Sequence, residues 1–531
     1  MAWLKRFMKK TILILAVLLA VAFSVRLVIA FNTYVISSDG PFYLSVAKDF
    51  ADGDFKQALI KQTFHQLYPF AIAVASKFIS NWEWAGMLAS IILSSLGVIP
   101  LYFIARKYFS DAITIIACLL YCFHPQGAQL SAAIFTTGMH ISILLFAIWV
   151  TIAALETGKN LYFILAGILA FAMYLNRPDG LAFLGITLLG IMFLSRPNDR
   201  TRPNGSSSGR MVGQAVFSWR EKGVKAICLV IPWLFMFIPY LFVVESATGI
   251  FGLTGKVSAE AVTDIGITKS FGGLYQFVVE FIKGANPILF IFWLVGLVSY
   301  IRNKEKPFKS AHFAWLVFAG FMVFFAVYAF THGRMSKRYT VPLFLMMLPW
   351  TAAGIYYLGD KISSRATSKV VSVLIIILLM ILSVFTFKPV GKDKVIEKTT
   401  GELLKKYHSA RSNRIKSPVI ITTLSRIAYY AGGTNIMPEG WDKDDREISD
   451  FLQSLKDSVR WSGADYIVLD SRIIRKFPEA LTELSRMSME KDIAGISDNV
   501  RAELISVYFN KGEGDSYKVY RFSSILVPVR K

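Results

Sequence analysis

The polar residues that could do chemistry in this sequence lie at the ends of its long apolar segments. Asp39 follows the first of them, in Ser37-Ser38-Asp39-Gly40-Pro41, where its carboxylate is suited to act as a general base. The alternative is structural, because Asp39 can instead cap a helix that Pro41 opens. Both interpretations stay open at this level.

A second group of residues is suited to holding an anion. Arg177 lies in Asn176-Arg177-Pro178-Asp179-Gly180, and a guanidinium binds phosphate oxygens through two parallel hydrogen bonds. Asp179, two residues on, would hold Arg177 in place. The alternative is a turn stabilised by an aspartate cap and an arginine that reaches towards water.

The strongest sign of an anionic ligand is a basic cluster between two apolar segments. His332, Arg334, Lys337 and Arg338, with Tyr339 after them, lie in a short loop that we expect on the outer side of the membrane. Positive charge usually gathers on the inner side, so this cluster departs from the rule. An ordinary solvated loop is the alternative.

Three further histidines are considered as candidate ligand-binding residues. His65, in His65-Gln66-Leu67-Tyr68-Pro69, is placed to bind phosphate or sugar, or to make a structural hydrogen bond. His124 and His140 flank apolar segments, and we interpret both as helix-end or packing residues.

The elements that must position these residues are membrane helices. Of the 531 residues 54% are hydrophobic, and several apolar runs reach the roughly 20 residues that span a bilayer. We predict about eleven spans. Their limits are 11–31, 84–105, 112–124, 137–155, 161–175, 180–195, 225–244, 285–301, 312–331, 339–358 and 370–387.

The net charge of +22 would suggest nucleic-acid binding in a soluble protein, but the distribution of the basic residues fits the membrane plan instead. Most Lys and Arg residues cluster at the ends of the apolar runs, where they determine topology and contact lipid headgroups. Alternate loops are basic, which predicts a cytoplasmic N-terminus. The first apolar run is long and predicts an uncleaved first span rather than a signal peptide.

Two domains are predicted, residues 1–390 in the membrane and 391–531 in water outside the cytoplasm. Outer loops at 32–83 and 245–284 belong to the first domain, and contain stretches typical of helices in the membrane interface. The second domain is predicted to be a small α/β domain. It would have strands at 417–422, 464–470, 506–508 and 517–522, a helix at 424–432 and a turn at 511–515. Cys118, Cys122 and Cys228 all lie in apolar runs, which implies no disulfide framework.

The set of motifs, in this order, resembles the GT-C superfamily of membrane glycosyltransferases. It is most similar to the branch of protein O-mannosyltransferases and the lipid A aminoarabinose transferase. The resemblance rests on Asp39 with Tyr43 after it, on His65-Gln66-Leu67-Tyr68-Pro69, on Arg177-Pro178-Asp179-Gly180 and on Arg338-Tyr339. In the tail it rests on residues 426–432 and 464–470.

The resemblance implies a GT-C-type polytopic helical fold and a sugar donor carried on polyprenyl phosphate. Asp39 would be the catalytic base, and Arg177 and Arg338, assisted by Lys337 or His332, would bind the donor phosphate. The implied residues for donor or acceptor sugar are Tyr43, His65, Tyr68, Asp179 and Tyr339. The acceptor would be a glycan, a lipid or a protein.

No metal site is readable in the sequence, although a divalent cation stays open because some distant members of the superfamily use one. We expect a bacterial inner membrane, with membrane lipids as further partners. A transporter or flippase of a lipid-linked anionic glycan is the main alternative, and a structural subunit of an envelope complex is another.

Overall fold

The computed structural model describes residues 2–62, 65–194, 217–250, 267–302, 311–333, 335–362, 367–411, 417–436, 465–470, 500–509 and 516–524. The chain divides into two compact units. The membrane unit comprises Met1–Asn32 and Tyr43–Pro389, and the C-terminal unit comprises Thr33–Phe42 and Val390–Lys531. The boundary between the membrane unit and the C-terminal unit therefore falls after Pro389. Thr33–Phe42, from the predicted first outer loop, groups with the C-terminal unit.

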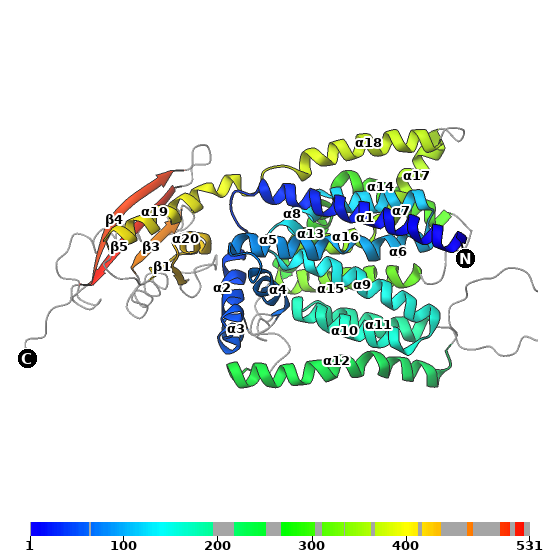
Figure 1. Cartoon of the computed structure of the whole chain (residues 1–531), viewed down its shortest axis with the longest axis horizontal. Helices are drawn as coiled ribbons and strands as arrows, with labels where there is room; N and C mark the ends of the chain where they lie inside the picture. Colours follow the sequence, from blue (N-terminus) through cyan, green and yellow to red (C-terminus); the bar gives the residue numbers. More distant parts are fainter. Residues whose placement is uncertain are drawn as a thin grey trace, which may run out of the picture. The chain divides into compact units, whose positions relative to one another are not determined.

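Long apolar helices build the membrane unit (Figure 1). Six stretches are long and apolar enough to cross a bilayer within the described residues. They are formed by α1 (Ala2–Phe31), α5 (Trp82–Ser95) with α6 (Val98–Tyr108), α9 (Thr136–Thr157), α12 (Trp219–Thr248), α15 (Ala311–His332) and α18 (Thr367–Thr386).

Three further stretches qualify as helix pairs with a sharp bend, which brings the total to 9 in the described residues. They are α7 (Asp111–Phe123) with α8 (Pro125–Ala132) at 53°, α13 (Ile267–Ala285) with α14 (Pro287–Arg302) at 93°, and α16 (Lys337–Met346) with α17 (Leu348–Ile362) at 59°. Proline explains two of the bends, because Pro125 and Pro287 open the second helix and lack the N–H that would continue the first.

The predicted spans at 161–175 and 180–195 coincide with α10 (Asn160–Asn176) and α11 (Gly180–Leu194), which are apolar but shorter. Every predicted span thus has a helical counterpart, and the expected polytopic helical membrane fold is confirmed. The first outer loop folds into α2 (Gly40–Ala51), α3 (Phe55–Lys61) and α4 (Leu67–Ser76). In Figure 1, α2 and α3 run across the direction of the long helices.

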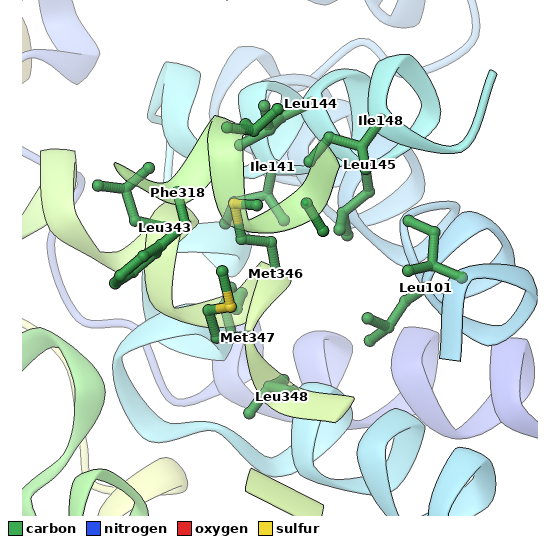
Figure 2. Packing of buried hydrophobic residues seen from close by; sticks show 14 of the residues in the cluster. Leu101, Ile141, Leu144, Leu145, Ile148, Phe318, Leu343, Met346, Met347 and Leu348 are labelled. Atoms are coloured by element: carbon green, nitrogen blue, oxygen red, sulfur yellow. The ribbon is translucent and has the colours of Figure 1, made fainter. Parts of the chain in front are cut away.

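One continuous apolar core joins the helices that carry the candidate residues. Figure 2 shows Ile141, Leu144, Leu145 and Ile148 of α9 beside Leu343 and Met346 of α16. Close backbone approach also occurs between α14 and α17, where a Cβ added to Gly296 would lie 1.9 Å from the carbonyl oxygen of Trp350. Small residues at such crossings let membrane helices pack tightly.

The C-terminal unit holds a five-stranded sheet of order β2-β1-β3-β5-β4. Its elements are η2 (Lys392–Lys394), α19 (Val395–Arg411), β1 (Val419–Ile421), α20 (Ser425–Tyr430), β2 (Thr434–Ile436), β3 (Tyr466–Asp470), β4 (Val500–Phe509) and β5 (Ser516–Ser524). β1 runs parallel to β2 and β3, and β5 is antiparallel to β3 and β4. The predicted α/β domain is confirmed. The predicted turn at 511–515 lies outside the described residues.

Candidate functional site

The junction between α10 and α11 is a tight turn whose shape follows from its residues. Arg177 ends α10 in an extended conformation (φ −158°, ψ 146°), as expected of a residue that precedes proline. The amide of Gly180 donates to the carbonyl of Arg177 at 3.1 Å. A Cβ on Gly180 would lie 2.2 Å from the backbone nitrogen of Tyr174, so only glycine fits there without displacing the chain.

This turn places an ion pair in the interior of the protein. Nη2 of Arg177 lies 3.0 Å from Oδ2 of Asp179, and the two side chains are 7% and 4% exposed. His140, from α9, brings its Nε2 to 3.6 Å from the same carboxylate oxygen. Apart from these ion-pair contacts, both carboxylate oxygens of Asp179, Nη2 of Arg177 and Nδ1 of His140 are buried without a hydrogen bond to any of the described residues. Buried polar atoms usually have partners, so this cluster is suited to receive the polar groups of a ligand.

The basic loop after α15 meets this ion pair, although the two lie far apart in the sequence. The guanidinium carbon of Arg177 lies 4.6 Å from the ring centroid of Tyr339, and that of Arg338 lies 5.4 Å from the same ring. Nη1 of Arg177 also donates to the carbonyl of Arg338 at 3.4 Å. Two arginines and one aspartate therefore share a small volume, with a net formal charge of +1.

His65 is tied to the same region through the last turn of α10. Its Nδ1 lies 2.7 Å from the carbonyl oxygen of Tyr174, and the two rings meet edge to face at 5.6 Å. The backbone of His65 is left-handed, with φ 69°, which is uncommon for a residue other than glycine. Gln62 donates to its carbonyl at 2.7 Å. Such strain is often found where a side chain has a function.

Two tyrosines of the first outer loop pack on each other. The rings of Tyr43 and Tyr68 meet edge to face at 5.3 Å. The hydroxyl of Tyr68 lies 2.6 Å from Oγ of Ser90, and its side chain is fully buried. Burial raises the pKa of the Tyr68 hydroxyl above its ordinary value, so this group stays protonated at neutral pH. The sugar-binding role of both tyrosines stays a prediction.

Helix α13 holds the remaining part of the basic loop. Oε2 of Glu280 accepts from the backbone N–H of Lys337 at 3.2 Å, and Oε1 accepts from Lys283 at 3.0 Å. The side chain of Gln276 accepts from the N–H of Met335 at 3.2 Å. These two residues of α13 fix the course of the loop before Arg338. Arg334 lies outside the described residues.

His332 packs on an aromatic ring of its own helix. Its ring stacks on Tyr328 with centroids 4.1 Å apart, and its Nδ1 lies 3.0 Å from the Tyr328 carbonyl. Tyr328 in turn lies 6.1 Å from Tyr339, measured between ring centroids. His332 is thus linked to the arginines through aromatic rings.

Asp39 belongs to the C-terminal unit and is half-buried at the start of α2. Oγ of Ser38 donates to its Oδ1 at 3.2 Å, and the amide of Gly40 donates to the carbonyl of Ser37 at 3.1 Å. These bonds make the predicted turn before α2. The assignment of Asp39 as a base is taken up below.

Sequence analysis did not single out Gln276 or Glu280, and it interpreted His140 as a helix-end or packing residue. A lone histidine in an apolar span resembles a packing residue, and only its contact with Asp179 distinguishes it. Within the described residues, no three His, Cys, Asp or Glu side chains gather in a way that could hold a metal ion.

Comparisons with known proteins bear on the fold. Residues 66–219 match the family model described as dolichyl-phosphate-mannose-protein mannosyltransferase. The crystal structure of ArnT from Cupriavidus metallidurans bound to undecaprenyl phosphate superposes with a TM-score of 0.61 at 11% identity, covering 96% of this chain and 98% of that one. The chain has the GT-C fold.

An archaeal relative supports the same fold. The oligosaccharyltransferase AglB from Archaeoglobus fulgidus, in complex with an inhibitory peptide and a dolichol-phosphate, gives a TM-score of 0.57 at 12% identity, covering 99% of this chain and 76% of that one. No curated protein sequence matches the chain. The predicted resemblance to the mannosyltransferase and ArnT branch of GT-C proteins is confirmed.

Proposed function

We propose that this GT-C protein transfers a sugar from a polyprenyl-phosphate carrier to an acceptor hydroxyl, with inversion at the anomeric carbon. The observation that carries the proposal is the convergence of Arg177 and Arg338 on the ring of Tyr339, beside the buried Asp179. Two similar structures hold undecaprenyl phosphate and a dolichol-phosphate, which are ligands of the proposed class.

The charge of the arginine cluster suits such a donor. A sugar linked to polyprenyl phosphate is a phosphodiester with one negative charge, which the net +1 of Arg177, Asp179 and Arg338 balances. When the bond from the anomeric carbon to the phosphate oxygen breaks, a second negative charge develops on the phosphate. Two guanidinium groups held in place by Tyr339 and Asp179 would stabilise that charge as it forms.

Asp39 is the proposed base. It would take the proton of the acceptor hydroxyl while the oxygen of that hydroxyl bonds to the anomeric carbon and polyprenyl phosphate departs. General base catalysis of this kind contributes about 10²–10⁴-fold in rate. Tyr43, His65, Tyr68, Asp179 and Tyr339 are the proposed sugar contacts, and Lys337 and His332 the proposed assistants at the phosphate.

The expected location is a bacterial inner membrane, crossed many times, with a cytoplasmic N-terminus and the C-terminal unit on the outer side. This orientation follows from the distribution of Lys and Arg. It puts Asp39 and the basic loop on the same side of the membrane as the C-terminal unit.

A complementation assay tests the proposal. A null strain receives the wild type, Asp39→Asn, or the control Asp52→Asn, which changes an exposed aspartate of the same outer loop. Membrane levels are matched by immunoblot, and mass spectrometry compares envelope glycolipids, polysaccharides and glycoproteins. We expect a glycan mass increment with the wild type and the control, and none with Asp39→Asn. Equal restoration by Asp39→Asn would reject the catalytic role and favour transport of a lipid-linked glycan.

A further inference from the structure

The segment that carries Asp39 is held by the C-terminal unit. Thr33 forms a parallel bridge with Val390, and the amide of Tyr34 donates to the Val390 carbonyl at 3.0 Å. This contact fixes the start of the segment. Its end is fixed by a different element, the short helix α20.

The short helix α20 supplies three hydrogen bonds to the segment. The hydroxyl of Tyr430 accepts from the amide of Ile36 at 3.2 Å, and Nη1 of Arg426 donates to the carbonyl of Ile36 at 3.4 Å. Oγ of Ser425 donates to the carbonyl of Ser38 at 2.9 Å. The last bond holds the residue that directly precedes Asp39, so α20 fixes the chain at both Ile36 and Ser38.

Arg426 is itself held rigidly. Its Nε and Nη2 donate to the two carboxylate oxygens of Glu397 at 2.6 and 3.0 Å, and Glu397 is 1% exposed. A guanidinium paired with a carboxylate in this two-bonded manner has little freedom to rotate. The remaining nitrogen therefore meets the Ile36 carbonyl at a fixed position.

These contacts lead from the soluble domain to the proposed base. We propose that Ser425, Arg426 and Tyr430 are positioning residues that set the place of the Asp39 carboxylate, an inference that rests on the proposed function of Asp39. A base acts only within hydrogen-bond reach of the proton it removes, and a misplacement of about 1 Å can cost 10²-fold in rate. The C-terminal unit would thus take part in the reaction by holding a segment almost 400 residues upstream, as the separation of 394 residues between Ile36 and Tyr430 shows.

The test uses the full-length protein in membranes of the null strain. The double variant Ser425→Ala/Tyr430→Phe removes two of the three bonds but keeps the rings, the helix and the ion pair between Arg426 and Glu397. Its control, Ser409→Ala/Tyr407→Phe, makes the same two changes in α19, away from the segment. Arg426→Ala is a stronger variant, for which membrane levels are checked because it leaves Glu397 buried without its partner.

The readouts are the initial rate of the glycan mass increment and the rise in thermal midpoint that added undecaprenyl phosphate produces. We expect the double variant to lose about 10²-fold in rate while its stabilisation by undecaprenyl phosphate equals that of the wild type. The control is expected to keep the wild-type rate. This pattern separates loss of positioning from loss of donor binding or of folding.

Two results overturn the inference. One is a rate within threefold of the wild type in both the double variant and Arg426→Ala, and the other is a loss of rate matched by an equal loss of stabilisation by undecaprenyl phosphate. Failure of the proposed function is recognised separately, since Asp39→Asn would then keep the wild-type rate. If Asp39→Asn is inactive and the α20 variants are active, only the positioning role is wrong.

Discussion

The guanidinium of Arg177 stacks on the ring of Tyr339, with 4.6 Å between its central carbon and the ring centroid. Replacing Tyr339 with leucine removes this face, whereas phenylalanine keeps it. A desolvated cation–π contact contributes about 2 kcal/mol, so Tyr339→Leu should lower the rate of sugar transfer about 30-fold and Tyr339→Phe much less. Equal losses in the two variants would show that the hydroxyl, and not the ring face, is what matters.

Single and double substitutions of Arg177 and Asp179 separate the effect of their charges on stability from the effect on activity. Arg177→Ala alone leaves a buried carboxylate without its partner, which costs about 3–5 kcal/mol of stability. The double variant Arg177→Ala/Asp179→Asn removes both charges and should recover most of that stability in a thermal unfolding assay.

Activity should nevertheless stay low in the double variant, by about 10²–10³-fold, because a donor to the departing phosphate is missing. The rate is measured in membranes with the protein level matched to the wild type. Recovery of activity together with stability would mean that Arg177 only neutralises Asp179 and does not contact the donor.

The sequence predicted the apolar spans and the cations near the site because hydropathy and charge asymmetry are local signals. It did not predict that Arg177 and Arg338 share one aromatic ring, since this depends on how α10 and α16 pack. The bond between Ile36 and Tyr430 joins elements at opposite ends of the chain, and no periodicity reports it. The contact of His140 with Asp179 could not be predicted for a similar reason, because Asp179 lies in the turn between α10 and α11, far from His140 in the sequence.

His140 is expected to orient the Asp179 carboxylate, from which its Nε2 is 3.6 Å away. His140→Leu preserves much of the volume but removes this polar contact. This contact is longer than a hydrogen bond and acts through electrostatics alone, so we expect a loss of about tenfold or less in rate. His124→Leu is not a suitable control, because His124 caps α8. Thr151→Val is suitable, because Thr151 is a buried residue of α9, the helix that carries His140. A wild-type rate in His140→Leu would return His140 to a packing role.

His65 offers a test in which stability and activity should move apart. His65→Gly relieves the left-handed backbone at φ 69° but removes the contact of Nδ1 with the Tyr174 carbonyl. Each effect is about 1 kcal/mol, with opposite sign, so the thermal midpoint should change little. If His65 contacts the donor, the rate falls at least tenfold at an unchanged midpoint. A purely structural histidine would leave the rate unchanged as well.

Gly180 tests whether the Arg177 turn must keep its shape. A Cβ at this position would lie 2.2 Å from the backbone nitrogen of Tyr174, and backbone cannot move aside as a flexible side chain can. Gly180→Ala should therefore cost about 1–3 kcal/mol of stability and displace Arg177 from Tyr339, with a loss of activity.

Gly185 provides the matched control, because it lies in the same helix α11 and no atom of the described residues comes within 4 Å of an added Cβ. Gly185→Ala should leave the rate unchanged and raise stability by about 0.5–1 kcal/mol, since alanine loses less conformational freedom than glycine in a helix. Thermal unfolding in detergent and the rate in membranes are compared for the two variants. If Gly180→Ala behaves like Gly185→Ala, the turn tolerates displacement, and the position of Arg177 does not depend on the close contact between Gly180 and Tyr174.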